Sequence, residues 1–192
     1  GSLEKDRGRY YDHYCSILEW MGDRFGEKII AWWFDSAGEH ARHPDTPWLR
    51  FTQAARTGHP ERLVAYNTGI TNFLSCTDFQ DFWAGEMDGL AFRPRGAATP
   101  TGLPWYAFVT WHGHDRYCQR PVWGIEFEPE NGPKNRDWMK WPPVETVAIR
   151  DFLRRFAVAG GAVTFNVPCY QDGSLYEPDL QALRGLRGLL RG

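Results

Sequence analysis

Short apolar runs alternate with amphipathic segments along most of the chain, and this alternation restricts the fold more than any other feature. Runs typical of buried strands occupy residues 29–34, 62–68, 105–111 and 162–168. Apolar residues at helical spacing occupy residues 7–25, 47–59, 142–161 and 177–192. Because parallel strands need long crossover connections, which are usually helices, this order predicts an α/β fold with a parallel sheet flanked by helices.

One segment does not follow the pattern. Residues 70–104 mix aromatic pairs, acids, Gly and Pro without a sustained period. We expect a long loop there, and loops of this length in compact domains usually carry function.

Length and charge narrow the class of protein. The chain has 192 residues, which suits a single domain over residues 1–192, and its net charge of -2 gives little electrostatic basis for binding nucleic acid. No apolar run approaches the roughly 18 residues of a membrane-spanning helix, so no membrane association is expected. The first residues, "GSLEK", lack an apolar signal core, so we expect no signal peptide in this sequence and a soluble protein.

Cysteine and aromatic content give two further indications. The cysteines are scattered without a CxxC pair, which favours free thiols: Cys15, Cys76, Cys118 and Cys169. Aromatic residues make up 16% of the chain, including 10 tryptophans. Such content is compatible with a large core, but flat aromatic faces also line ligand pockets.

Asp35 follows the apolar run "IIAWWF" directly and precedes the small residues "SAG". The carboxyl ends of parallel strands are where ligands bind in α/β proteins, so an acid in this place is a candidate functional residue. An acid here also commonly starts a turn or caps the following helix. This stretch alone leaves both interpretations open.

Other polar and aromatic residues are expected at the same edge of the sheet. Asn67 and Trp111 end two further predicted strands, and six acids are available nearby: Asp35, Glu39, Asp78, Asp81, Glu86 and Asp88. Two carboxylates in unequal environments are the minimum for glycoside hydrolysis. Asp35, on a stiff element, suits a nucleophile, and a loop acid such as Glu86 suits a proton donor. From the residues alone, a solvated loop charge is the simpler interpretation of Glu86.

Motifs for other chemistries are weak or missing. Two groups offer nitrogen and oxygen donors, namely Glu39-His40 with His43 and His112-Gly113-His114-Asp115, but neither has a known metal-binding spacing. The sequence has no GxSxG, GxGxxG or GxxxxGK[ST] pattern. We therefore expect no cofactor and no metal. A metal-dependent hydrolase using His112 and His114 remains a less favoured alternative.

Three segments, in the right order, resemble the α-L-fucosidases, which are retaining glycoside hydrolases with a (β/α)8-like barrel. The first is "YYDHYCSILEWMGDRFGEKIIAWWFDS", and the second is "LVAYNT" followed by "DFQDFWAGEMDG". The third is "FLRRFAVAGGAVTFNVPCYQDGSL". The resemblance implies that Asp35 is the nucleophile, that Glu86 is the acid/base, and that the substrate is an α-L-fucoside or a related sugar. We expect four residues to bind this sugar: Trp33, Asn67, Trp83 and Trp111.

The sequence also departs from the family pattern. Thr68 and Gly69 follow Asn67 where the family has Asp and a sugar-binding Arg, and Ser36 replaces the glycine after the nucleophile. The family's first three strands have no counterpart. The resemblance therefore implies half of a TIM-like barrel, with about five parallel strands and flanking helices.

Half of a barrel exposes two sheet edges and an apolar face, which favours a homo-oligomer. The alternative to an enzyme is a catalytically silent half-barrel that binds sugar or only oligomerises.

Overall fold

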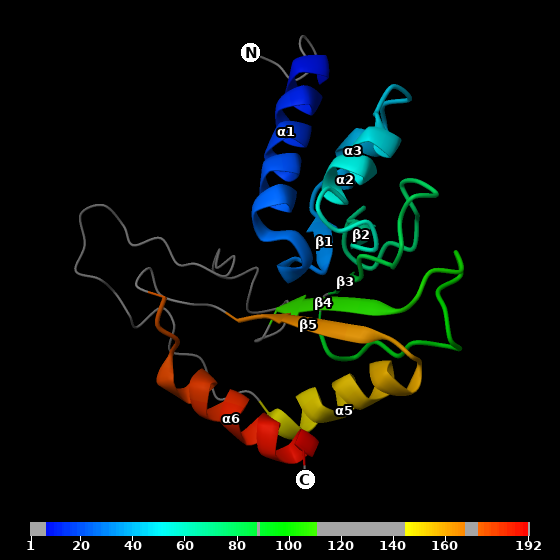
Figure 1. Cartoon of the computed structure of the whole chain (residues 1–192). Coiled ribbons are helices and arrows are strands. Elements are labelled where there is room, and N and C mark those ends of the chain that lie inside the picture. Colours follow the sequence, from blue (N-terminus) through cyan, green and yellow to red (C-terminus); the bar gives the residue numbers. More distant parts are fainter. Residues whose placement is uncertain (1–6, 88, 111–144, 168–172, 192) are drawn as a thin grey trace, which may run out of the picture. The chain divides into compact units, whose positions relative to one another are not determined.

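A computed structural model describes residues 7–87, 89–110, 145–167 and 173–191 (Figure 1). The chain divides into two compact units: unit 1 is Gly1–Ala84 with Pro100–Pro104, and unit 2 is Gly85–Thr99 with Trp105–Gly192. The described residues form five α-helices and five strands, and every strand pair among them is parallel. The predicted α/β class is confirmed, while closure into part of a barrel stays a prediction.

Unit 1 contains a two-stranded parallel sheet with helices. Its elements are α1 (Arg7–Phe25), the short 3-10 helix η1 (Gly26–Lys28), β1 (Ala31–Phe34), α2 (Ala37–Ala41), α3 (Trp48–Ala55) and β2 (Leu63–Tyr66). In the register of the sheet, Ala31 lies opposite Leu63 and Phe34 opposite Tyr66. The helix predicted at 7–25 is confirmed with the same bounds, and the other predicted helix and strands of this region are confirmed with shorter bounds. The five-residue helix α2 was not predicted.

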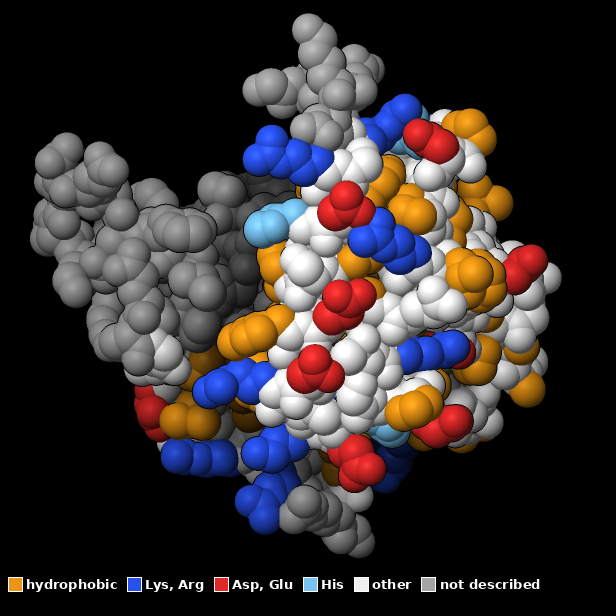
Figure 2. All heavy atoms as spheres, turned by 45° about the horizontal axis from the view of Figure 1, so that its top comes forward, with side chains coloured by type: hydrophobic (Ala, Val, Ile, Leu, Met, Phe, Trp, Pro, Cys, Tyr) orange, Lys and Arg blue, Asp and Glu red, His pale blue; other side chains and the backbone are white. Residues whose placement is uncertain are grey.

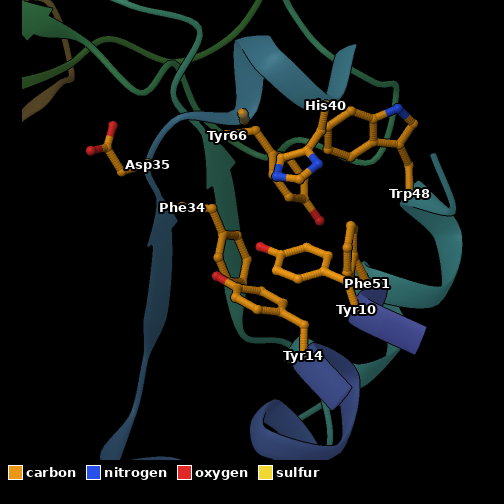
Figure 3. Close-up of a pocket in the computed structure, with 9 residues that line it drawn as sticks. Tyr10, Tyr14, Phe34, Asp35, His40, Trp48, Phe51 and Tyr66 are labelled. Atoms are coloured by element: carbon orange, nitrogen blue, oxygen red, sulfur yellow. The ribbon is translucent and has the colours of Figure 1, made fainter. Parts of the chain in front are cut away.

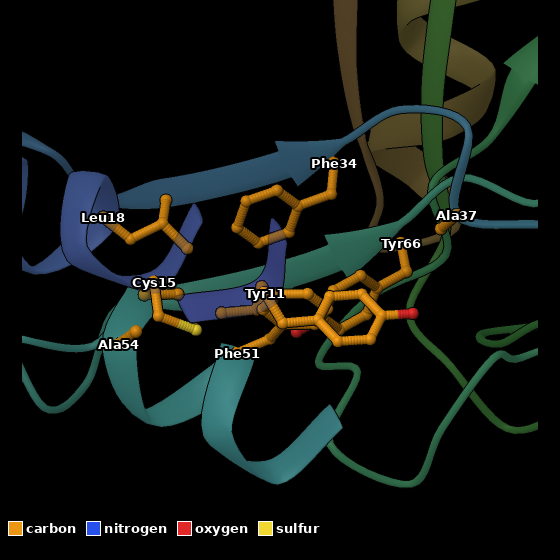
Figure 4. Packing of buried hydrophobic residues seen from close by; sticks show 10 residues of the cluster. Tyr11, Cys15, Leu18, Phe34, Ala37, Phe51, Ala54 and Tyr66 are labelled. Atoms are coloured by element: carbon orange, nitrogen blue, oxygen red, sulfur yellow. The ribbon is translucent and has the colours of Figure 1, made fainter. Parts of the chain in front are cut away.

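The core of unit 1 lies between its sheet and the helices α1 and α3. Because successive strand residues point to opposite faces, Phe34 and Tyr66 share the face that meets these helices. Figure 4 shows both rings directed toward side chains of α1 and α3, and the buried cluster includes Tyr11, Cys15, Leu18, Phe51 and Ala54. The opposite face of β1 therefore carries Trp33 and, at its end, Asp35.

A close backbone contact and a buried arginine hold the ends of α1 and α3 together. A Cβ atom at Gly22 would lie 2.3 Å from the backbone oxygen of Thr57, so only glycine permits this approach. Arg62 is fully buried and donates hydrogen bonds to four backbone oxygens, those of Gly26, Ile29, Ala55 and Thr57. Burial lowers the pKa of its guanidinium.

Unit 2 contains a three-stranded parallel sheet in the order β3-β4-β5. Its elements are β3 (Glu86–Met87), β4 (Tyr106–Thr110), α5 (Thr146–Val158), β5 (Ala162–Asn166) and α6 (Glu177–Arg191). Phe152 of α5 contacts Phe165 of β5, with ring centroids 6.3 Å apart, and Ile149 of α5 packs with Leu186 of α6. The predicted strands at 105–111 and 162–168 and the two predicted helices are confirmed with shorter bounds.

The segment 70–104 is not entirely loop, because β3 lies within it and pairs with β4. Two residues are too short to show a period in the sequence. One local signal is Gly85, whose φ is +59° and where a Cβ atom would lie 2.0 Å from the backbone oxygen of Tyr106. Only glycine allows the chain to enter β3 so close to β4.

The surface carries charged side chains of both signs, and the described cysteines are reduced. On the face drawn in Figure 2, acidic and basic side chains are interspersed, and hydrophobic side chains also reach the surface. No helix in the described part of the chain is both long and apolar enough to cross a membrane. Cys15 and Cys76 are free thiols, as predicted, whereas Cys118 and Cys169 lie outside the described residues.

Candidate active site

The candidate site of unit 1 is at the carboxyl end of its sheet, where Asp35 follows β1 and Asn67 follows β2. Strand pairing continues to this point, since the Asn67 backbone N–H donates to the Phe34 oxygen at 2.7 Å. The structure thus brings Asp35 and Asn67 side by side, as expected for residues that end neighbouring parallel strands.

Hydrogen bonds fix the orientation of the Asp35 carboxylate. Its Oδ1 accepts from the backbone N–H of Ser36 at 2.7 Å and from Nδ2 of Asn67 at 2.9 Å. Asn67 is 3% exposed, and its Oδ1 accepts from the backbone N–H of Gly69 at 3.0 Å. Within the described part of the chain, Oδ2 of Asp35 accepts no hydrogen bond, and the side chain is exposed. One carboxylate oxygen is held, and the other can meet a ligand.

The turn after Asp35 has an unusual backbone conformation. Ser36 has a φ of +58°, in the left-handed region that favours glycine. A non-glycine residue there costs roughly 1–2 kcal/mol. This conformation aims the Ser36 N–H at Asp35 Oδ1 and explains why glycine is the usual residue at the matching position of the family that the sequence resembles. Sequence reasoning missed Ser36 as a donor because a backbone N–H leaves no residue signature.

Trp33 lies on the same face of β1 as Asp35, two residues earlier along the strand. Its indole Nε1 donates to the backbone oxygen of Ala84 at 2.7 Å, and the side chain is half-buried. Figure 3 shows the Asp35 carboxylate directed away from the rings that lie between the sheet and the helices. Trp33, Asp35 and Asn67 therefore share the sheet face opposite α1 and α3.

A small cavity lies on the helix side of the sheet, and Asp35 and Ala37 form part of its lining. It measures about 40 Å³, and its lining includes Tyr10, Tyr14, Phe34, His40, Trp48, Phe51 and Tyr66. Neighbouring rings are close, for example Trp48 and Tyr66 with centroids 5.0 Å apart. Since a water molecule needs about 10–15 Å³ of such space, the cavity has room for a few waters.

His40 belongs to this aromatic cluster. Its ring stacks on Tyr10 with centroids 5.7 Å apart and an interplanar angle of 12°. Burial, and secondarily the nearby His43, lowers the pKa of His40, while Glu39 acts in the opposite direction. Within the described residues, no three His, Cys, Asp or Glu side chains are placed to hold a metal ion. His112 and His114 of the metal hypothesis lie outside the described residues.

Glu86 is the first residue of β3, so the prediction that it lies in a loop is wrong. It lies opposite Phe108 in the register, while Met87 lies opposite Val109, which in turn lies opposite Phe165. Because Phe165 contacts α5, the Met87 face of the sheet is the helix side, and Glu86 is on the opposite face. Its side chain is half-buried. Glu86 is part of unit 2, whereas Asp35 is part of unit 1.

The structure places the remaining candidates differently. Trp83 is 2% exposed, donates from its indole Nε1 to the Asn72 oxygen at 2.7 Å, and stacks on Phe73 with centroids 4.8 Å apart. This burial favours a packing role, and a sugar contact for Trp83 stays a prediction. Trp111 and Asp88 lie outside the described residues, and Glu39 and Asp78 are exposed.

Asp81 has a structural environment. It forms an ion pair with Arg56, with Nη2 2.8 Å from Oδ2, and its Oδ2 also accepts from the Val64 backbone N–H at 2.7 Å. Its own N–H donates to the Val64 oxygen at 2.8 Å. Asp81 thus completes the hydrogen bonds of β2, as a further strand would.

No protein-family model matches the chain, and no curated protein matches it by sequence. The fold is similar to that of the endo-fucoidan hydrolase MfFcnA9 from glycoside hydrolase family 107, at a TM-score of 0.61 and 16% identity, covering 92% of this chain and 35% of that one. For the endo-fucoidan hydrolase MfFcnA4, the TM-score is 0.62 and the identity 16%, with 92% and 29% covered. For α-L-fucosidase isoenzyme 1 from Paenibacillus thiaminolyticus, the TM-score is 0.61 and the identity 18%, with 96% and 39% covered.

These similarities concern the fold. The chain spans about a third of the length of the solved structures that it matches. Its fold is therefore similar to part of the fold of these hydrolases, and a shared fold alone does not define the function of a protein.

Proposed function

We propose that the chain is the nucleophile-bearing part of a retaining glycosidase of the α-L-fucosidase type, and that its substrate is an α-L-fucoside or a related sugar. The observation that carries the proposal is the Asp35 carboxylate itself, which is exposed at the end of a parallel strand with Oδ1 held by Ser36 and Asn67. The fold similarity to fucose-active hydrolases supports the same conclusion.

In the proposed reaction, Oδ2 of Asp35 attacks the anomeric carbon and forms a covalent glycosyl ester, while Glu86 protonates the departing oxygen. Glu86 then takes a proton from water, and that water cleaves the ester and returns Asp35 to its carboxylate form. Two inversions at the same carbon give net retention. This mechanism requires the two carboxyl groups to lie about 5–5.5 Å apart in the working enzyme.

Sugar binding in this proposal uses the face shared by Trp33, Asp35 and Asn67. The Trp33 indole is fixed in orientation by its bond to Ala84, so it offers a rigid apolar surface close to the nucleophile. Asn67 orients the Asp35 carboxylate through its Nδ2 group. We expect the Asn67 side-chain amide to contact the sugar as well. Trp83 and Trp111 complete the proposed set of sugar-binding residues.

The stereochemistry of the product tests the mechanism. We expect 4-nitrophenyl α-L-fucoside to release α-L-fucose first, as observed by proton NMR before the anomers equilibrate. First formation of the β-anomer would contradict a nucleophilic Asp35. Release that stops on addition of a chelator would favour the metal-dependent alternative.

Absence of turnover has a different meaning. If fucose still binds in calorimetry while no nitrophenol is released, the result supports the second candidate, a silent half-barrel that binds sugar. The observation that favours this candidate is the partial coverage of the neighbouring structures, about a third of each.

We also propose that the chain associates with itself through exposed sheet edges. Ile30 and Leu63 are 72% and 49% exposed and adjacent, since the Leu63 N–H donates to the Ile30 oxygen at 3.1 Å. Exposed apolar side chains at the start of the two strands favour contact with a second chain.

Light scattering coupled to size exclusion tests this association. We expect a mass of at least twice the 22.2 kDa of one chain at micromolar concentration, and a lower mass for Leu63→Asp. A compact monomer of the unaltered chain would contradict the proposal.

A further inference from the structure

The turn that carries Asp35 is held on two sides. On one side Asn67 binds the carboxylate. On the other side, α2 begins directly after Ser36, with Ala37 buried. A Cβ atom at Gly38 would lie 3.1 Å from the backbone oxygen of Thr68, so α2 packs closely on the segment that follows β2. A shift of α2 would therefore displace the backbone on which Asp35 depends.

The helix α2 has five residues, too few to be stable on its own. Its main anchor is His40, whose ring stacks on Tyr10 and tilts against Tyr11 with centroids 5.8 Å apart. The His40 backbone oxygen accepts from Oγ1 of Thr46 at 2.7 Å, and its Nδ1 is 3.5 Å from the hydroxyl of Tyr11. Figure 3 shows the imidazole among the rings, on the other side of β1 from the Asp35 carboxylate.

We propose that His40, whose ring stacks on Tyr10 of α1, is a positioning residue that fixes the turn carrying Asp35. The proposal rests on the proposed function of Asp35, but the geometry that carries it lies in the aromatic cluster. His40 touches none of the reacting atoms, so it acts only through α2 and the Ser36 backbone.

The surroundings of His40 favour its neutral form. The titratable or charged groups around it are Tyr10, Tyr11, Tyr14 and Arg7 from α1, Asp35 from the end of β1, Glu39 and His43 from α2 and its end, Asp45 from the following loop, and Tyr66 from β2. The Asp35 carboxylate is directed away from the imidazole (Figure 3). Burial raises the pKa of Tyr10 and Tyr14, and raises that of Tyr66 to about 12, so these rings stay neutral. Of the acids, Glu39 is exposed and pairs with Arg42, and Asp45 pairs with Arg7.

The contacts of His40 are expected to weaken at acidic pH. Since the pKa of folded His40 is below its ordinary value of about 6.5, its stabilising contacts are fully present above pH 6.5. They are lost as the pH falls through the lowered pKa, because the charged ring prefers water. We therefore expect α2 to loosen, and the Asp35 turn to move, in the range below pH 6.5.

An NMR titration of the full chain from pH 8 to pH 5 tests the proposal without any need for turnover. The expected result is one shared midpoint below pH 6.5 for the His40 ring signals and the backbone amides of Ser36 and Gly38. In His40→Phe, which keeps a stacked ring but cannot titrate, those amides should lose this midpoint. A merely structural role would leave them without a titration in either protein.

Control variants separate neighbouring groups. The exposed His13→Gln should keep the shared midpoint, and so should Asp35→Asn, which removes the carboxylate's own titration. In His43→Gln the midpoint should stay shared but move to higher pH, because His43 lowers the pKa of His40. If His40→Phe does not fold, the titration of the unaltered chain still tests the proposal. The proposal is overturned if the His40 ring titrates while the amide signals of Ser36 and Gly38 stay unchanged. Because this outcome is independent of hydrolysis, it is distinguishable from a failure of the proposed glycosidase function.

Discussion

Asp35→Asn is expected to lower kcat/KM for 4-nitrophenyl α-L-fucoside by at least about 10³-fold, or about 4 kcal/mol of transition-state stabilisation. The substitution keeps the shape of the side chain and an oxygen that can accept from Ser36 or Asn67. It removes the negative charge that attacks the anomeric carbon, and an amide is a poor nucleophile. Initial rates with the aryl fucoside measure the effect.

The matched control for this variant is Asp78→Asn, because Asp78 is an exposed acid in the segment after β2 and has no assigned role. We expect it to retain the activity of the unaltered chain. Thermal melts monitored by circular dichroism should be equal for both variants, so that loss of activity is not loss of fold. Activity of Asp35→Asn within threefold of the control would remove Asp35 from the mechanism.

Chemical rescue distinguishes a nucleophile from a residue that only stabilises charge. In Asp35→Gly, azide can enter the vacated space and attack the anomeric carbon from the face that Asp35 occupied. The expected product is β-L-fucosyl azide, with inversion at the anomeric carbon. Rescue that yields free fucose without the azide adduct would instead assign Asp35 a role as a base.

The sequence predicts the position of Asp35 and Asn67 well, for a physical reason. Both follow short apolar runs, and the ends of neighbouring parallel strands meet at one edge of a sheet. The register of Phe34 with Tyr66 then brings the next residue of each strand together. Strand periodicity also assigns Trp33 to the Asp35 face, since it depends only on alternation along the chain.

Other parts of the site could not be predicted. The helix α2 and the strand β3 have five and two residues, which is too short to show a repeating pattern of apolar side chains. Their formation depends on distant contacts, such as His40 with Tyr10 and Gly85 with Tyr106. The burial of Trp83 has the same origin, because its partners Asn72 and Phe73 give no sign of the contact in the sequence. These features are set by tertiary packing.

Arg62 is the residue whose loss should destabilise the fold most. It is fully buried and has no carboxylate partner in the described part of the chain, and its guanidinium binds backbone oxygens at 2.6–2.8 Å. Two of these oxygens, of Gly26 and Thr57, lie just beyond α1 and α3, and a third, of Ala55, is at the end of α3. The carbonyls at helix ends have no partner within the helix. Gly26 and Ala55 also accept from the Ile29 N–H and the Trp32 indole, whereas the oxygens of Thr57 and Ile29 depend on Arg62 among the described residues.

Arg62→Met is therefore expected to lower the free energy of unfolding by about 3–5 kcal/mol. Methionine fills much of the same space, but among the described residues it leaves the oxygens of Ile29 and Thr57 without a donor, each costing about 1–3 kcal/mol before water or relaxation compensates. The oxygens of Gly26 and Ala55 keep the Ile29 N–H and the Trp32 indole as donors. Urea unfolding at pH 7, followed by tryptophan fluorescence, measures the change. The free energy of unfolding of Arg62→Lys should lie between those of the unaltered chain and Arg62→Met, because an ammonium group has three donors but lacks the planar geometry of guanidinium.

The control for Arg62→Met is Arg42→Met, which removes an exposed arginine whose ion pair with Glu39 is worth no more than about 0.5 kcal/mol. A loss below about 1 kcal/mol in Arg62→Met would mean that water reaches the oxygens of Ile29 and Thr57 and that the arginine is not essential. The expected large loss has a consequence for the site. Arg62 precedes β2 directly and binds the oxygen of Ile29 just before β1. By fixing where both strands begin, it also fixes where they end, at Asp35 and Asn67.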